Sequence, residues 1–293
     1  MTEPEVRPVA SSVNPTVRRR RLGQELRKLR ELKGMTAEEV AERLLVSQSK
    51  ISRLENGRRS ISQRDVRDLC GVYGVEDHRI VDSLMQMAKE SRQQGWWHAF
   101  GDIPYSVYIG LETDAASLRI YEASVVPGIL QTPGYATAVT EGSWPEATAA
   151  EIERRVQVRM RRQERITDPD NPLRLWAVID ESAVRRIVGT RATMCEQLEH
   201  LVQLSLQPYI TVQILPFDVG AHPGMYGKFC ILEFHDPQDA STVYLEGITS
   251  DLYLEKPSDV QVYSVMYEHL RMQALNAEQT RRFLLSAADE YRD

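Results

Sequence analysis

Apolar residues recur with helical spacing through the N-terminal part of the chain and predict five short helices. Leu22, Leu26 and Leu29 repeat at intervals of four and three residues, which places them on one face of the first helix. Thr36-x-x-Glu39 has the form of a capping box and starts the second helix. The pattern predicts a disordered tail over residues 1–17, an all-α domain over residues 18–75 whose third helix runs from Ser47 to Glu55, and a connecting helix over residues 76–94.

Beyond residue 94 the pattern changes to alternating and continuous apolar runs, which are typical of strands. Four strands are predicted, at residues 173–179, 210–215, 229–234 and 242–245. Helical spacing predicts helices at residues 150–166, 182–188, 191–206, 258–273 and 277–291. Residues 95–293 are therefore expected to form a larger mixed α/β (α+β) domain with at least four strands and C-terminal helices, whose strand order the pattern does not give.

Charge is distributed unevenly along the chain. Residues 1–70 hold 16 Lys and Arg against 10 Asp and Glu, whereas the other 223 residues hold 20 against 32. This asymmetry favours phosphate binding at one end, although basic arms also occur on proteins with other functions. There is no apolar run of 18 residues, no signal-peptide centre, and no metal-binding spacing around the three distant cysteines. We expect a cytoplasmic protein with no membrane span, metal or cofactor.

The third predicted helix has a polar outer face suited to DNA. Ile51 and Leu54 are three residues apart and must face inward. Side chains that can hydrogen-bond to base edges in the major groove occupy the outward face: Gln48, Ser49, Ser52 and Arg53. Residues flanking this face are placed to hold DNA phosphates, which fix register without reading sequence: Thr36, Ser47, Lys50, Asn56, Arg58 and Arg59. A solvated polar face without a DNA role is the alternative that periodicity alone leaves open.

The segment Met35–Gly57, and above all its stretch Ser-Gln-Ser-Lys-Ile-Ser-Arg-Leu-Glu-Asn-Gly, resembles the phage-repressor or xenobiotic-response-element type of helix-turn-helix. The resemblance implies a phage-repressor-like helix-turn-helix domain that binds double-stranded DNA through the residues named above. It also implies that Glu55 pairs with a basic residue of the first helix, here Arg30. Many relatives carry Gln where this chain has Ala37, so one phosphate contact is expected to be missing.

The basic run Arg18–Arg21 lies at the start of the first helix. It could cross a phosphate or reach into a minor groove, as homeodomain arms do. A solubilising charge cluster explains it equally well.

Three features of the second domain have a functional and a structural interpretation. Aromatic residues that could line a ligand pocket, or form plain core, are Trp96, Trp97, Tyr105, Tyr108 and Tyr121. The arginine-rich helix at 151–165 could touch DNA or an acidic partner, or present a solvated face. His222 in a loop, and Asp180-Glu181 after a strand, lack the partners that catalysis needs, and no enzyme motif is present. We therefore expect no enzyme.

The stretch 121–136, the arginine helix and residues 212–217 resemble the effector domain of a large actinobacterial family, long labelled of unknown function and described as antitoxin-like. The resemblance implies a repressor-type transcriptional regulator controlled by a small partner protein. The limited surface of one DNA-binding module favours a homodimer. Two alternatives remain: a ligand-gated repressor whose C-terminal domain binds a small molecule, and an enzyme tethered to DNA.

Overall fold

The computed structural model describes residues 15–57, 59–92, 95–101, 103, 105–168, 171–236 and 239–292. The chain divides into two compact units, of which the first ends at His98 and the second begins at Ala99. The predicted tail lies outside the described residues as far as residue 14, and the first helix begins at Pro15.

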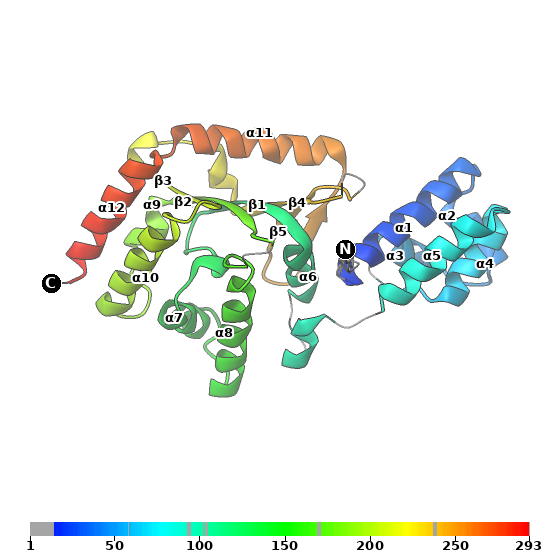
Figure 1. Ribbon diagram of the computed structural model, residues 1–293, viewed down its shortest axis with the longest axis horizontal. Helices are drawn as coiled ribbons and strands as arrows, with labels where there is room; N and C mark the ends of the chain where they lie inside the picture. The colour runs from blue at the N-terminus through cyan, green and yellow to red at the C-terminus, as the bar shows by residue number, and fades with distance from the viewer. Residues whose placement is uncertain are drawn as a thin grey trace, which may run out of the picture. The chain divides into compact units, whose positions relative to one another are not determined.

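The first unit contains the five predicted helices, which confirms the all-α assignment. Their apolar faces meet in one core that includes Leu22, Leu26, Val40, Ile51 and Leu54. The helices are α1 (Pro15–Leu32), α2 (Ala37–Arg43), α3 (Gln48–Glu55), α4 (Gln63–Tyr73) and α5 (His78–Glu90), followed by a 3-10 helix at Trp96–Phe100 (Figure 1).

Local hydrogen bonds set the starts of these helices where the sequence pattern places them. Thr36 and Glu39 form a reciprocal capping box at α2, and Ser62 forms one with Asp65 at α4. Ser47 caps α3 by accepting a hydrogen bond from the backbone nitrogen of Lys50. Because a cap fixes the first turn of a helix, these side chains determine where α3 starts.

Two glycines allow α1 to approach the end of α3 closely. A Cβ at Gly23 would lie 2.5 Å from the carbonyl oxygen of Glu55, which is shorter than a normal van der Waals contact. Gly57 has a φ of +63° and faces the backbone of Arg20. The first position requires the absence of a side chain, and the second also requires a left-handed backbone.

The second unit is built on one six-stranded mixed sheet, in the order β3-β2-β1-β4-β5-β6. β1 pairs in parallel with β2, and β2 with β3, whereas β1–β4, β4–β5 and β5–β6 are antiparallel. The strands are β1 (Ala115–Glu122), β2 (Arg174–Asp180), β3 (Ile210–Leu215), β4 (Phe229–Phe234), β5 (Thr242–Leu245) and β6 (Leu252–Leu254).

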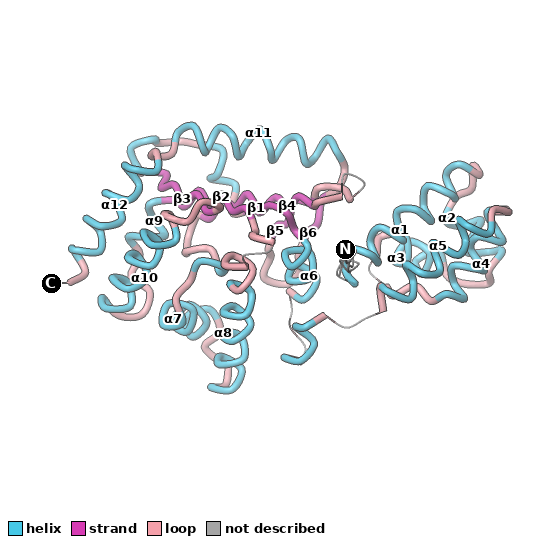
Figure 2. The backbone as a smooth tube through the Cα atoms, in the orientation of Figure 1, coloured by secondary structure: helices cyan, strands magenta, loops and turns pink. Residues whose placement is uncertain are grey.

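Helices lie on both sides of this sheet, as Figure 2 shows with the strands in magenta. The apolar side chains of α11 (Pro257–Gln273), among them Tyr267 and Leu270, pack on one face. The opposite side carries α6 (Ser106–Asp114), α7 (Pro133–Ser143), α8 (Ala149–Gln163) and α10 (Arg191–Leu204). The remaining helices are α9 (Glu181–Arg185) and α12 (Ala277–Glu290), the latter packed on α10 and β3.

The fold class predicted for this unit is confirmed, and the structure adds elements that the pattern does not predict. The four predicted strands correspond to β2, β3, β4 and β5. The strands β1 and β6 and the helices α6 and α7 are additional. Within the described residues, no helix is both long enough and apolar enough to cross a membrane.

The Gly23→Ala substitution is expected to destabilise the first unit by about 1–3 kcal/mol, because the new methyl group overlaps the backbone of α3. The matched control is Gly71→Ala in α4, where an added Cβ meets no atom within 4 Å. Since alanine is the better helix former, the control is expected to be stabilising by up to about 1 kcal/mol. Urea unfolding followed by circular dichroism measures both, and equal effects would contradict the close approach.

Candidate functional site

The outer face of α3 presents the four residues predicted to read bases. Ile51 and Leu54 are buried with at most 2% of their surface exposed, and they anchor the helix to the core. The side chains predicted to read bases are all exposed: Gln48, Ser49, Ser52 and Arg53. Since none of these side chains is acidic, nothing on this face opposes the approach of a polyanion.

Hydrogen bonds one helical turn apart organise this face. Arg53 Nη2 donates to Ser49 Oγ at 2.7 Å, and Asn56 Nδ2 donates to Ser52 Oγ at 3.3 Å. Each bond holds a long donor side chain along the helix surface. Both pairs are solvent-exposed, so base or phosphate groups could replace the serine partners at little cost.

The residues predicted to hold phosphates have different surroundings. Lys50 Nζ lies 3.1 Å from Asp65 Oδ1 of α4, so this ammonium already has an anionic partner. Burial alone would raise the pKa of Asp65, but hydrogen bonds from Ser62 and Lys50 bring it below its ordinary value. The hydroxyls of Thr36 and Ser47 act as helix caps.

Arg59 is exposed beyond the end of α3 and its backbone nitrogen bonds to the carbonyl oxygen of Arg53. Its side chain can therefore reach a phosphate next to the recognition face. Arg58, which has the same predicted role, lies outside the described residues.

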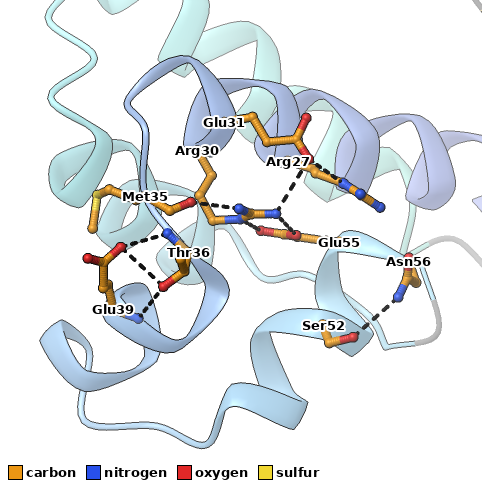
Figure 3. Close-up of polar contacts among 9 residues, drawn as sticks. All are labelled: Arg27, Arg30, Glu31, Met35, Thr36, Glu39, Ser52, Glu55 and Asn56. Atoms are coloured by element: carbon orange, nitrogen blue, oxygen red, sulfur yellow. Dashed lines mark hydrogen bonds and ion pairs between the residues drawn. The ribbon is translucent and has the colours of Figure 1, made fainter.

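A buried ion pair joins α1 to the end of α3 (Figure 3). Arg30 donates from Nε to Glu55 Oε1 at 2.7 Å and from Nη2 to Glu55 Oε2 at 2.9 Å. Its Nη1 donates to the carbonyl oxygen of Met35 at 2.7 Å. The hydrogen bond to Glu55 raises the pKa of Arg30. The structure thus brings together the two residues that the family resemblance paired.

The basic run Arg18–Arg21 belongs to the first turns of α1, and all four side chains are half-buried. Arg18 pairs with Glu90 of α5. Burial lowers the pKa of Arg19, with a smaller contribution from the charge of Arg20. In this conformation the run packs along the helix and does not form an extended arm.

The predicted aromatic cluster is divided by the fold. Tyr105 and Tyr108 line a cavity of about 400 Å³ in the second unit. Tyr121 is on the opposite face of the sheet, where it packs in the cluster of Tyr267. Trp96 and Trp97 fall within the first unit.

Side chains on one face of the strands form one wall of this cavity. Ile120 of β1, Cys230 of β4 and Tyr244 of β5 are neighbours in the strand register. Tyr244 stacks on Tyr108 of α6 with ring centroids 4.4 Å apart. The loop after β1 and two arginines of α8, Arg159 and Arg162, contribute further lining.

Two arginines of α8, Arg159 and Arg162, face the protein interior, so the solvated-face interpretation is wrong for these two, whereas Arg154 and Arg161 are exposed. Arg162 donates twice to Glu112, both bonds at 2.6 Å, and both side chains are buried. Burial alone would lower the pKa of Arg162, but the Glu112 carboxylate raises it. Arg159 Nη1 donates to the carbonyl oxygen of Ala136 and to Thr140 Oγ1.

A carboxyl group that the sequence pattern does not single out also lines the cavity. Glu122 ends β1 and makes no hydrogen bond to a described residue; its Oε2 is shielded from solvent. Burial raises the pKa of Glu122 to about 7, the nearby charge of Lys228 lowers it, and that of Glu246 raises it. Recognising β1 as a strand would have flagged it, because strand ends often carry functional carboxylates.

Asp180 and Glu181 at the end of β2, and His222 in the loop, make contacts within the second unit. Asp180 caps α9, and Glu181 Oε2 accepts a hydrogen bond from the backbone nitrogen of Phe217. His222 Nε2 lies 3.6 Å from Asp180 Oδ2. Among the described residues, no group of three His, Cys, Asp or Glu side chains could hold a metal ion.

Comparison with known proteins finds two families along the chain. Residues 105–286 match the family described as "Domain of unknown function (DUF5753)", and residues 21–81 match the family described as "Helix-turn-helix domain". No curated protein and no solved structure matches the chain. The N-terminal match covers α1 from Arg21 onward, all of α2, α3 and α4, and the first residues of α5, including all the residues of the α3 face described above.

Arg30→Met is expected to destabilise the first unit by about 3–5 kcal/mol, because it leaves the Glu55 carboxylate buried without a partner. Arg27→Met is the control, since its pair with Glu31 is exposed and is expected to contribute less than about 1 kcal/mol. Urea unfolding measures both variants. The double variant Arg30→Met, Glu55→Leu should recover most of the lost stability. If Arg30→Met alone lost no more stability than Arg27→Met, the stabilising role of the buried pair would be contradicted.

Proposed function

We propose that this chain, which belongs to the DUF5753 family, is a sequence-specific DNA-binding transcriptional regulator of repressor type. Its N-terminal helix-turn-helix domain binds double-stranded DNA with α3 in the major groove. The observation that carries the proposal is the exposed, acid-free face of α3, which sits on a helix anchored by Ile51, Leu54 and the pair of Arg30 and Glu55.

The proposed contacts are divided between base edges and phosphates. Arg53 can donate both guanidinium branches to a guanine once it leaves Ser49, and Gln48 can pair with an adenine. Ser49 and Ser52 accept or donate at neighbouring bases. The residues proposed to hold phosphates are Thr36, Ser47, Lys50, Asn56, Arg58 and Arg59. Lys50 would first have to leave Asp65, so Arg59 is the stronger candidate among the described residues.

The regulator is proposed to act as a homodimer that is controlled through its second unit. A single helix-turn-helix module buries a limited surface, and two modules bind half-sites about 34–36 Å apart. A small partner protein is the proposed control, as the antitoxin-like resemblance suggests. The cavity beside Tyr108 favours a second candidate, in which a small molecule controls DNA binding.

Arg53→Ala is expected to weaken binding to the operator by about 1–3 kcal/mol and to relax sequence preference at one position. The operator is first selected from random duplexes with the purified protein. Arg282→Ala is the control: it removes the same charge from an exposed position on α12 of the second unit. If Arg53→Ala lost equal affinity for operator and for random DNA, its role in reading bases would be refuted.

Arg59→Ala is expected to weaken binding to every sequence alike and to reduce the slope of log affinity against log salt by about 1. The reason is that a phosphate contact releases counterions but reads no base. Fluorescence anisotropy over a salt series measures this slope. An unchanged slope would count against the phosphate contact.

Control by a partner protein predicts that the native chain co-purifies with a small protein and that adding this protein changes operator affinity. Mass analysis of the purified complex, for proteins and for small molecules, separates the two candidates. A protein that co-purifies but leaves operator affinity unchanged would argue against partner control. A bound metabolite that changes operator affinity would favour the second candidate.

A further inference from the structure

The cavity of the second unit lies where the order of the strands reverses. From β1 the chain proceeds through β2 to β3, each added in parallel on one side, and then returns to place β4 on the other side of β1. In open α/β sheets, ligands bind outside the carboxyl ends of the strands at such a switch point. The carboxyl end of β1, at Ile120 and Glu122, lines this cavity together with the start of β4 at Cys230. The cavity therefore lies at the carboxyl end of the parallel part of the sheet, next to the antiparallel β4.

The walls of the cavity suit an apolar or aromatic body. Tyr108 and Tyr244 stack against each other, and Trp144 lies on another side beneath the guanidinium of Arg155, whose Cζ is 4.2 Å from the ring centroid. The volume of about 400 Å³ lies within the range of metabolite-binding pockets.

The cations that line the cavity already have partners. Arg162 is held by Glu112, Lys228 Nζ lies 2.6 Å from Glu246 Oε2, and Arg159 donates to a carbonyl and a hydroxyl of α7. An anionic ligand would have to displace the carboxylates that hold Arg162 and Lys228, and it would lie close to Glu122. The arrangement therefore disfavours an acid as the ligand.

Unsatisfied acceptors remain in the same cavity. Glu122 Oε2 and Gln131 Oε1 are shielded from solvent and have no hydrogen-bond partner, and the Tyr105 hydroxyl is in the same state. Gln131 is only 2% exposed, and its amide nitrogen is already held by the carbonyl oxygen of Val126. Buried acceptors without donors are costly, so a ligand that brings donors gains affinity here.

We infer that this cavity binds an organic amine, whose ammonium group lies beside Glu122 and whose apolar body lies against Tyr108 and Tyr244. Such a ligand supplies the donors that Glu122 and Gln131 lack, and a hydrogen bond between two charged groups is among the stronger ones. Burial raises the pKa of Glu122, and an ammonium group held beside the carboxylate would lower it again. Binding of the amine does not depend on the proposed function. Only the idea that the amine controls DNA binding rests on the second candidate function.

Three probes that share one ring and differ in charge test this inference: 2-phenylethylamine, phenylacetate and 2-phenylethanol. Binding to the full chain is measured by calorimetry and ligand-observed NMR without DNA, so the result does not depend on whether the chain regulates transcription. The amine is expected to bind at least about ten-fold more tightly than phenylacetate, the value of one charged hydrogen bond. Preference for phenylacetate, or no binding by any probe at millimolar concentration, would overturn the inference; the second outcome means that the cavity holds water alone.

Substitutions then locate the amine. Glu122→Gln keeps the shape of the side chain and removes its charge, so it should abolish the preference for the amine while leaving 2-phenylethanol unaffected. Glu164→Gln is the matched control, because this carboxylate is exposed beyond α8 and outside the cavity. Val139→Phe, which fills the cavity, should weaken all three probes. An amine affinity that survives Glu122→Gln would place the binding elsewhere and refute the assignment.

Discussion

The geometry of the DNA-binding unit depends on one buried guanidinium. Arg30 uses Nε and Nη2 for the two oxygens of Glu55 and Nη1 for the carbonyl oxygen of Met35, and both charged side chains are at least nine-tenths buried. A planar fork that forms three bonds at once fixes angles as well as distances. It therefore ties the end of α3 to α1 and to the turn before α2, and so holds the polar face of α3 at a defined orientation (Figure 3).

Most of the first unit could be predicted because its signals are short-range. A cap acts within three residues, as Thr36 does on Glu39, and an apolar stripe acts within one or two helical turns. Even the long-range pair of Arg30 and Glu55 could be assigned, although only through family resemblance. What the sequence could not reveal is competition among polar groups: Lys50 is held by Asp65, which belongs to another helix fifteen residues away.

The second unit was predicted less completely because its decisive contacts are distant in sequence. β1 begins with Ala-Ala-Ser, a stretch without β-branched residues, and becomes the central strand because β2 and β4 pair with it on either side. From the sequence, Arg162 is expected at the surface of a charged helix. It is buried because it pairs with Glu112, fifty residues earlier in the chain. Neither partner can be identified from the residues next to it in the chain, which is also why the cavity between β1 and α8 could not be foreseen.

Two buried glutamates, compared with the half-buried Glu122, show why this cavity differs from the rest of the interior. Glu55 and Glu112 each receive two hydrogen bonds from an arginine, so that desolvation is balanced by a bidentate pair. Glu122 receives none from the described residues, and burial raises its pKa to about 7. In the part of the chain that the structure describes, the fold thus supplies bidentate partners for two buried carboxylates but no hydrogen bond for a third at the switch point of its sheet. Within the chain, this third charge is offset by Lys228, which is itself paired with Glu246. Water can supply hydrogen bonds to this carboxylate, whereas a bound amine with an apolar body supplies a charge as well and packs against the tyrosines.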